Sequence, residues 1–312
     1  MYHYVRPPVD APPFGYYHLA LSDFREQLDY FEATYTIPDR ETALEALSGS
    51  RSLPEDSLIL TFDDGLRDHV EWVLPELTKR GLWGMFFVPA GPYLHNQVLD
   101  VHRVHTLLGR FDSDRLVDVL GDILDASLDR PLTRSDSGSL YGNRDEVDTI
   151  SRFKQLINDE LSRTERDDVL TALEHRVFES HPVDPAEVYM SQGDLQTLVD
   201  EGMLLGGHSA SHRILARLDE SEQRREIERS FDFLTRTVGD QPLRTFAYPY
   251  GTDTTYSSET LTCLEEAGCE VAFTTVSNAI TPSDIAQRNL RLPRRDCTEF
   301  KHGDSTADFP PS

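Results

Sequence analysis

The feature that most constrains the fold of this chain is a short apolar segment that ends in two acidic residues. Leu58-Ile59-Leu60 predicts a buried strand, and Thr61-Phe62-Asp63-Asp64-Gly65 follows it directly. An amphipathic helix over residues 70–77 then leads to a second apolar strand at Met85–Val88. A strand, a helix and a strand at this spacing predict a βαβ unit, and hence the parallel sheet of an α/β fold.

Two adjacent carboxylates at the end of a buried strand carry an electrostatic cost. Burial and mutual repulsion both oppose the ionisation of Asp63 and Asp64, so an isolated pair would tend to retain a proton. A divalent cation relieves this cost, because it binds one carboxylate and leaves the other for acid–base work. Gly65 permits a sharp turn beside the pair. The pentapeptide alone also allows a strand-end loop with two solvated aspartates.

The alternation of strands and helices continues on both sides of a long interruption. Ser22 is the expected N-cap of an early helix, and Pro75 is expected to kink the helix after the first motif or to mark its late start. We expect further strands at residues 2–5, 245–248, 271–275 and 290–296, and helices at about 23–31, 41–47, 192–201, 221–238 and 257–267.

The interruption itself has helical periodicity. It extends from about residue 94 to residue 187 and contains a Ser/Gly/Asp-rich segment at 134–143 that is typical of a loop. We therefore predict one domain over residues 1–300 that is interrupted by a helical insertion at about 94–187. Residues 301–312 are expected to form a polar tail.

The chain is strongly acidic. Its 55 Asp and Glu residues against 30 Lys and Arg residues give a formal net charge of −25, and lysine occurs only at positions 79, 154 and 301. This charge argues against nucleic acid or an anionic membrane surface as a partner. An acidic, lysine-poor composition resembles that of proteins from salt-accumulating organisms, because a Debye length of about 3 Å at about 1 M salt screens surface repulsion. We favour this halophilic interpretation over that of an ordinary acidic cytoplasmic protein.

The sequence as given shows neither an export signal nor a membrane segment. Met1–Val5 are polar and aromatic, and no apolar run approaches about 18 residues. We therefore expect a cytoplasmic protein that is not inserted into a membrane.

A second motif, His208-Ser209-Ala210-Ser211-His212, places two histidines four residues apart. In a helical turn this spacing puts both imidazoles on one side, where they can bind one metal ion. With Asp64 the pair would form a site of two histidines and one carboxylate that keeps positions open for water and substrate. Two histidines at this spacing also occur by chance as exposed or capping residues, so the motif alone does not decide.

A third segment, Phe246-Ala247-Tyr248-Pro249-Tyr250-Gly251, surrounds a proline with aromatic residues. Such residues would form a rigid wall at a strand end that suits a sugar ring, and Tyr248, Pro249 and Tyr250 are the expected substrate contacts. A backbone N–H in this turn could also stabilise an oxyanion. The alternative is a tight aromatic turn without such a role.

Taken in order, the three segments resemble the motifs of the polysaccharide deacetylase family, which is defined by the NodB homology domain and is similar to carbohydrate esterase family 4. TFDDG resembles the first motif, HSASH the second and FAYPYG the third. The resemblance covers about residues 1–93 and 188–296, with the helical insertion outside it. Three motifs in the right order are a more specific signal than any one of them.

The resemblance implies a fold and an activity. The fold is a distorted (β/α) barrel, usually of seven strands, and the activity is divalent-metal-dependent removal of N-acetyl groups from amino sugars. By their motif positions, Asp63 is the general base for the attacking water, and the backbone N–H of Tyr250 helps to hold the oxyanion. Asp64, His208 and His212 bind the metal, which is most often Zn²⁺, with Co²⁺, Ni²⁺, Fe²⁺ or Mn²⁺ as alternatives.

One departure from the family pattern concerns an arginine. Many members have an arginine in the third motif that pairs with the catalytic aspartate, and Ala247 occupies that position here. Arg294, on the expected last strand, is the first candidate to replace it, and Arg291 is the second. Because the last strand of a closed barrel lies beside the first, we predict a two-pronged contact of Arg294 with Asp63 at about 2.7–3.2 Å.

A second departure concerns the general acid. The late leucine–histidine motif that supplies it in the family is not evident in this sequence. His3, His102 and His105 are candidates, although for each of them a structural role is expected over a catalytic one. Amide cleavage needs an acid that protonates the leaving amine. The sequence does not identify this acid.

The sequence therefore predicts a metal-dependent carbohydrate N-deacetylase that acts on an N-acetylated sugar in a polysaccharide or glycoconjugate precursor. One alternative is a hydrolase of another amide or formamide in the same superfamily. Another is a catalytically silent sugar-binding module that keeps the motifs without the acid. The oligomeric state, the sugar and the metal used in the cell are not determined by the sequence.

Overall fold

The structure is a computed structural model in which the chain divides into two compact units. The barrel unit comprises residues 1–8, 18–97 and 185–306, and the helical unit comprises residues 9–17, 98–184 and 307–312. The described residues are 1–7, 16–127, 150, 153–154, 156–157, 161, 163–178 and 183–304. The predicted loop at 134–143 and most of the predicted polar tail lie outside them. The prediction of one domain with an insertion is not tested by this division and stays a prediction.

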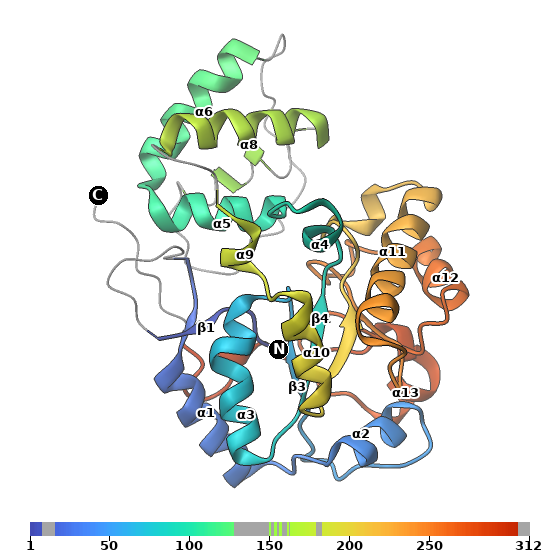
Figure 1. Ribbon diagram of the computed structural model, residues 1–312. Helices are drawn as coiled ribbons and strands as arrows, with labels where there is room; N and C mark the ends of the chain where they lie inside the picture. The colour runs from blue at the N-terminus through green and yellow to red at the C-terminus, as the bar shows by residue number, and fades with distance from the viewer. Residues whose placement is uncertain are drawn as a thin grey trace. The chain divides into compact units, whose positions relative to one another are not determined.

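A curled parallel sheet forms the centre of the barrel unit (Figure 1). Within the described residues it has five strands, each hydrogen-bonded to the next one along the chain. The strands in this order are β3 (Leu60–Phe62), β4 (Gly84–Val88), β5 (Leu204–Gly207), β6 (Thr245–Ala247) and β7 (Val271–Phe273).

Two single-residue bridges extend this sheet at both edges. Tyr2 pairs with Phe62 of β3, and Leu292 pairs with Phe273 of β7, both in parallel orientation. The chain start and the last bridging segment are also joined, because the amino group of Met1 donates to the carbonyl oxygen of Arg295 at 2.6 Å. The sheet therefore curls into the distorted α/β barrel that the sequence predicted.

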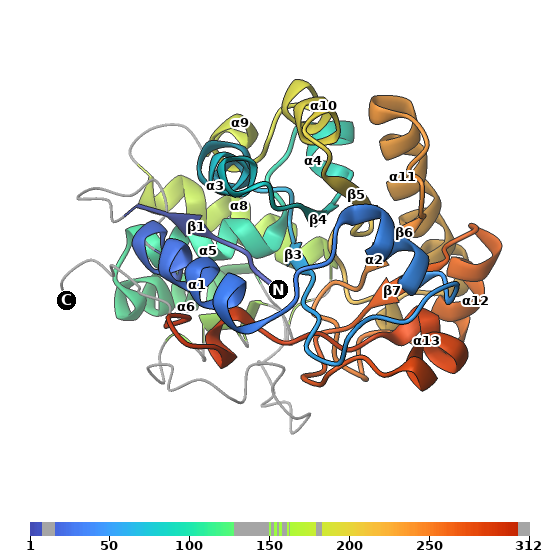
Figure 2. The same cartoon turned by 90° about the horizontal axis from the view of Figure 1, so that it is seen from below.

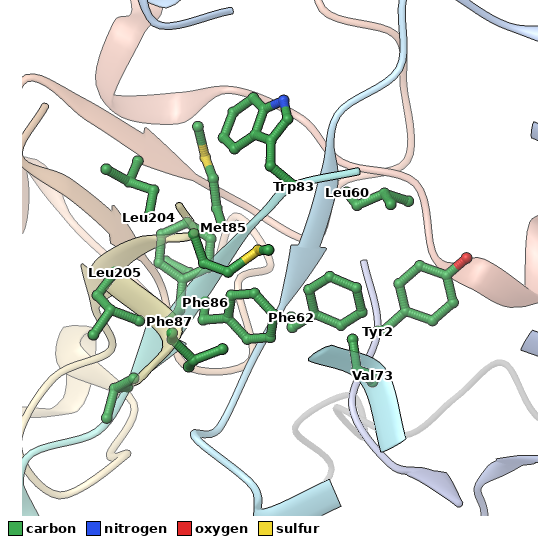
Figure 3. Packing of buried hydrophobic residues seen from close by; sticks show 14 of the residues in the cluster. Tyr2, Leu60, Phe62, Val73, Trp83, Met85, Phe86, Phe87, Leu204 and Leu205 are labelled. Carbon is green, nitrogen blue, oxygen red and sulfur yellow. The ribbon is translucent and has the colours of Figure 1, made fainter. Parts of the chain in front are cut away.

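Stacked aromatic rings link the first three segments of the barrel. The rings of Tyr2 and Phe62 stack with centroids 5.2 Å apart, and those of Phe62 and Phe86 stack at 4.6 Å. Both pairs are also register partners in the sheet. Figure 3 shows these rings within the buried cluster that also contains Met85 and Phe87. A one-residue slip would move these rings to the other face of the sheet, so their burial stabilises the observed register.

Helices connect the strands and surround the sheet, as Figures 1 and 2 show. Helices α10 and α11 pack against β5. The helices of the barrel unit are α1 (Leu21–Thr34), α2 (Arg40–Leu47), α3 (Leu74–Arg80), α4 (Gly91–His95), α9 (Pro185–Val188), α10 (Gln192–Asp200), α11 (Glu220–Val238), α12 (Ser258–Glu266) and α13 (Pro282–Arg288).

Three predicted element ends differ in the structure. Helix α1 begins at Leu21 with Ala20 as its N-cap, which makes no side-chain cap, so Ser22 is not the cap. The first strand shrinks to the bridge at Tyr2, and the following Val5–Arg6 (β1) pairs with Leu19–Ala20 (β2) in a separate two-stranded parallel sheet. The last predicted strand is a 3₁₀ turn at Asn289–Arg291 followed by the bridge at Leu292.

The helix after the first motif starts late, which is one of the two outcomes predicted for Pro75. A π-helical turn at His69–Val73 leads into α3, and Pro75 lies in the first turn of α3. A proline is tolerated there because the first turn of a helix needs no hydrogen bond from that N–H.

The helical unit contains α5 (Asp100–Arg110), α6 (Ser113–Ser127) and α8 (Arg163–Val177). Its apolar positions follow the predicted periodicity, since Leu107, Leu120 and Leu173 are fully buried. Arg103 of α5 donates to both carboxylate oxygens of Glu174 on α8, at 3.0 and 2.8 Å, and joins these helices. Among the described helices, none is both long and apolar enough to cross a membrane.

Candidate metal and catalytic site

The predicted site residues follow the carboxyl ends of the barrel strands. Because parallel strands end at the same edge of a sheet, residues from distant parts of the sequence meet there. Asp63 and Asp64 follow β3, His208 follows β5, Tyr248 follows β6, and Arg294 comes two residues after the Leu292 bridge.

The three predicted metal ligands are spaced as a small divalent cation requires. Nε2 of His208 and Nε2 of His212 each lie 3.3 Å from Oδ1 of Asp64, and the three ligand atoms lie within 4.8 Å of one another. In a tetrahedral site with bonds of about 2.0–2.1 Å, neighbouring ligand atoms are about 3.3 Å apart. Two imidazole nitrogens and one carboxylate oxygen suit zinc, and other first-row metals also accept this set. These buried residues therefore fit a divalent metal ion.

Electrostatic forces also favour a positive charge at this position. Burial opposes protonation of His208, but the carboxylates of Asp64 and Asp63 outweigh burial and raise the pKa of His208. A bound cation would compete with that proton for the imidazole nitrogen.

The orientation of His208 is set by its other ring nitrogen. Nδ1 of His208 lies 2.7 Å from the carbonyl oxygen of Ala247. A carbonyl oxygen only accepts, so Nδ1 carries the hydrogen, and Nε2 keeps its lone pair for a metal ion. Ala247, which stands where the resemblance predicted an arginine, thus contributes through its backbone.

The two histidines are brought together by a loop and not by the helical turn that their spacing predicts. Residues 208–212, all of them described, have no helical structure. Ser209 and His212 have positive φ angles of 60° and 55°, which are unfavourable for residues with a side chain. Oγ of Ser209 accepts a hydrogen bond from the N–H of His212 at 3.0 Å and closes a tight turn. This turn directs both imidazoles toward Asp64.

Asp63 and Arg294 form a two-pronged ion pair inside the barrel unit. Nη1 of Arg294 donates to Oδ1 of Asp63, and Nη2 donates to Oδ2, both at 2.7 Å. This geometry confirms the contact predicted from the sequence. Arg294 therefore supplies the guanidinium that Ala247 cannot provide, whereas the second candidate, Arg291, is exposed in the 3₁₀ turn.

The ion pair keeps Asp63 ionised. Burial by itself raises the pKa of Asp63, but the guanidinium of Arg294 outweighs burial and lowers this pKa to about 2. Nε of Arg294 donates to the carbonyl oxygen of Thr274 at 3.0 Å. The guanidinium carbon also lies over the rings of Phe87 and Phe273, 5.4 and 5.9 Å from their centroids. These contacts together orient the guanidinium of Arg294 toward Asp63.

The turn of the first motif has an unusual backbone. Asp64 has a φ of 80°, and Gly65 has a φ of 64°. The N–H of Asp63 donates to the carbonyl oxygen of Tyr2 at 2.9 Å, and the carbonyl oxygen of Gly65 accepts from the N–H of Met190 at 3.1 Å. Positive φ at a non-glycine residue costs energy and persists where the surroundings enforce it. The two hydrogen bonds anchor the backbone on both sides of Asp64.

The third motif divides into a buried and a site-facing part. The ring of Tyr248 is fully buried, stacks on Tyr256 at 4.4 Å, and its hydroxyl donates to the carbonyl oxygen of Leu290 at 2.8 Å. Tyr250 has a φ of 61°, and its ring meets that of His212 edge-on at 5.1 Å. The side chain of Tyr248 thus has a packing role, and substrate contacts by the motif remain a prediction.

The candidates for the general acid lie in different units. His3 belongs to the barrel unit, where its carbonyl oxygen lies 3.0 Å from Nε2 of His69. His3 also follows Tyr2, whose carbonyl oxygen accepts from the N–H of Asp63 at 2.9 Å. His102 and His105 belong to α5 of the helical unit.

Sequence reasoning missed the residues that support the second motif. Oγ of Ser230 accepts from the N–H of His208 at 3.2 Å, and the carboxylate of Glu226 accepts from the loop between the histidines. Both residues lie on α11. Their spacing of four residues places them on one helix face, which is a weak signal in a helix with many charged residues.

Comparison with known proteins relates part of this chain to a family. The polysaccharide deacetylase family model matches residues 175–272, a segment that contains the second and third motifs. No curated protein matches the sequence.

Solved structures of deacetylases share the fold. The Streptococcus pyogenes deacetylase PplD in complex with acetate has 15% identity and a TM-score of 0.55, over 94% of this chain and 90% of that chain. IcaB from Ammonifex degensii has 18% identity and a TM-score of 0.55, over 94% and 88%. A de-N-acetylase from Aggregatibacter actinomycetemcomitans has 13% identity and a TM-score of 0.52, over 94% and 92%. At these identities the likeness shows the fold. The fold and the family-model match therefore confirm the resemblance of this chain to the polysaccharide deacetylase family.

Proposed function

We propose that this chain is a metal-dependent hydrolase that removes N-acetyl groups from an amino sugar in a polysaccharide or glycoconjugate precursor. The observation that carries the proposal is the different environment of two neighbouring aspartates. Arg294 holds Asp63 ionised, whereas Asp64 faces His208 and His212. Amide hydrolysis needs a base for the attacking water and a centre that polarises the carbonyl group. The two aspartates fit these two requirements.

Asp63 is the proposed general base. Arg294 keeps its carboxylate ionised before the attack and orients it, and the proton of the attacking water passes to one of its two oxygens. A pKa of about 2 makes Asp63 a weak base, so the water must be made more acidic. A divalent cation held by Asp64, His208 and His212, with Zn²⁺ as the first candidate, would supply this Lewis-acid chemistry.

Tyr250 and His3 are proposed for the remaining two tasks. The backbone at Tyr250 is fixed by its φ of 61° and by the hydroxyl of Thr275, which donates to its carbonyl oxygen at 2.7 Å. Its N–H is the proposed donor to the oxyanion. His3 is the proposed proton donor to the leaving amine, because it follows Tyr2, whose carbonyl oxygen accepts from the N–H of Asp63 at 2.9 Å.

The proposed substrate is a small or linked precursor that carries an N-acetylated amino sugar. The family description and the similarity in fold to deacetylases support an acetylated sugar. The formal net charge of −25 disfavours a polyanionic substrate unless salt screens the surface. A nucleotide-linked or lipid-linked sugar in the cytoplasm would agree with the sequence-based expectation of location.

Release of acetate tests this proposal. The purified protein is incubated with N-acetylglucosamine oligomers and with the matching N-formyl oligomers, after chelator treatment and after addition of Zn²⁺ or Co²⁺. We expect acetate release that depends on added metal, and little or no formate release. Preferred release of formate would favour another amide or formamide hydrolase. Binding of the oligomers without turnover, under every metal condition, would favour a silent sugar-binding module.

A further inference from the structure

We propose that Glu226 is a positioning residue for the candidate metal site, because its carboxylate holds the loop between the two histidines in its ligating shape. Glu226 lies on α11, outside all three sequence motifs. The inference rests on the proposed function, since it concerns the same metal site. It adds a residue on which metal affinity depends although it supplies no ligand atom.

Three hydrogen-bond donors of the loop converge on this carboxylate. The backbone N–H groups of Ala210 and Ser211 donate to Oε2 of Glu226 at 3.0 and 2.7 Å. The hydroxyl of Ser211 donates to Oε1 at 2.7 Å. Successive N–H groups next to a residue in the left-handed conformation form a concavity that binds anions, and Ser209 has this conformation. A carboxylate satisfies all three donors and places its negative charge where their dipoles converge.

The same face of α11 holds the loop at its first ligand. Oγ of Ser230 accepts from the N–H of His208 at 3.2 Å. Ser230 follows Glu226 by four residues, so both side chains leave the helix on one side. The helix therefore supports the loop at His208 and again between the two histidines.

The turn that leads into α4 holds the loop carbonyls. The N–H groups of Ala90 and Gly91 donate to the carbonyl oxygens of Ser209 and Ala210 at 3.1 and 2.6 Å. These bonds hold two carbonyl oxygens of the loop. Glu226 holds two of the loop's N–H groups. Removal of Glu226 would release the N–H groups of Ala210 and Ser211, whereas the loop carbonyls would stay held.

The loop needs support because its conformation is unfavourable by itself. Ser209 and His212 both have positive φ angles, which a released loop would tend to abandon. Nε2 of His212 would then leave its position 3.3 Å from Oδ1 of Asp64. Groups that orient metal ligands without binding the metal typically contribute about 10- to 100-fold to metal affinity. We assign a contribution of this size to Glu226.

The test compares the metal affinity of Glu226→Ala with that of the wild type and of Glu228→Ala. Glu228 is exposed on the same helix, so its replacement makes the same change in charge and helix composition. Zn²⁺ dissociation constants are measured by competition with a chromophoric chelator, and the absorption spectrum of bound Co²⁺ reports the ligand geometry. We expect Glu226→Ala to weaken Zn²⁺ binding about 10- to 100-fold and to change the Co²⁺ spectrum, with Glu228→Ala within about twofold of the wild type.

Two milder variants keep the test decisive if Glu226→Ala does not fold. Ser211→Ala removes one of the three donors, and Glu226→Gln keeps the size of the side chain but loses its charge. We expect both to weaken Zn²⁺ binding while circular dichroism stays unchanged. Folded Glu226 variants with wild-type Zn²⁺ affinity and a wild-type Co²⁺ spectrum would overturn the inference. A wild-type protein that binds neither ion would instead contradict the metal site itself, and the inference with it.

Discussion

Charged residues lie in two contrasting regions of the barrel unit, the buried edge where its strands end and the outer surface. At the buried edge, the side chains of Arg294 and Asp63 are only 4% and 2% exposed, and their atoms meet at 2.7 Å. On the surface, those of Arg236 and Asp232 are 80% and 66% exposed, with a separation of 3.6 Å. An exposed pair contributes about 0–1 kcal/mol, whereas breaking a buried pair costs about 3–5 kcal/mol because it leaves an uncompensated charge.

This contrast shows that single charges and collective charge have different roles here. At the strand edge each carboxylate has its own environment, since Asp63 meets a guanidinium and Asp64 meets two imidazoles. On the surface a single pair contributes little, whereas the charges of the whole chain sum to a formal net charge of −25. Site variants should therefore change chemistry one residue at a time, and salt should change stability through the whole surface.

The largest effect is expected for a metal ligand. His208→Ala removes one of three ligand atoms, so the protein should lose bound metal and all measurable deacetylation. The fold should largely remain, because the barrel core does not depend on this side chain. Metal content by elemental analysis and circular dichroism of the same samples check both expectations. Wild-type metal stoichiometry in His208→Ala would refute the ligand assignment.

Arg294→Lys should have the next largest effect. Lysine keeps the charge but cannot form two parallel hydrogen bonds with Asp63. We expect kcat to fall by at least about 10-fold while metal content stays near that of the wild type. The matched control is Arg236→Lys on the surface, which should leave kcat unchanged. Equal kcat values for the two variants would remove the contrast between buried and exposed arginines.

A buried histidine should make stability depend on pH. His69 packs edge-on against the rings of Phe62 and Phe86, with centroids 5.7 and 5.6 Å apart, and burial lowers its pKa from 6.5 to about 4. The unfolded chain therefore takes up this proton at a higher pH than the folded protein. The resulting stabilisation is fully present above pH 6.5 and is lost as the pH falls toward about 4.

The expected loss from pH 7 to pH 5 is about 2 kcal/mol in the free energy of unfolding. Urea titrations at both pH values measure it. His69→Phe keeps an aromatic ring without a titratable group, so this part of the pH dependence should disappear in the variant. An identical pH dependence in both proteins would show that His69 does not cause it.

Each surface charge should change the stability of the protein only slightly, but together the surface charges should change its melting temperature measurably. If the acidity is an adaptation to salt, the melting temperature should rise steeply between about 0.1 M and above about 1 M KCl, as the Debye length falls from about 10 to about 3 Å. A scan at constant pH and several KCl concentrations measures this. A flat profile would contradict the halophilic interpretation and leave the charge unexplained.

Much of the site followed from sequence because it depends on simple topology. The pattern around Asp63 predicted a βαβ unit, and parallel strands bring their carboxyl ends to one edge. Motif order then indicated that Asp64, His208 and His212 would meet. The closure of the barrel made the contact between Arg294 and Asp63 predictable, although no local pattern links these residues.

Other features depend on tertiary contacts that periodicity does not contain. The spacing of His208 and His212 suits a helix, yet left-handed residues and a carboxylate from α11 hold it as a loop. The aromatic character of Tyr248 suggested a sugar contact, but its side chain is buried and its hydroxyl donates to the carbonyl oxygen of Leu290. The first strand is reduced to a single bridge because Val5 and Arg6 pair with Leu19 and Ala20 instead, and a 3₁₀ turn at Asn289–Arg291 takes the start of the predicted last strand.

The central claim is that two adjacent aspartates divide the work, with Asp63 as the base and Asp64 as a metal ligand. Asp63→Asn tests it most directly, in a side-by-side measurement of bound Zn²⁺ and acetate release from N-acetylglucosamine oligomers. We predict wild-type metal stoichiometry together with a fall in kcat of about 10²- to 10⁴-fold, the usual contribution of a general base. Loss of the metal, or nearly full turnover with the metal bound, would contradict this division of roles.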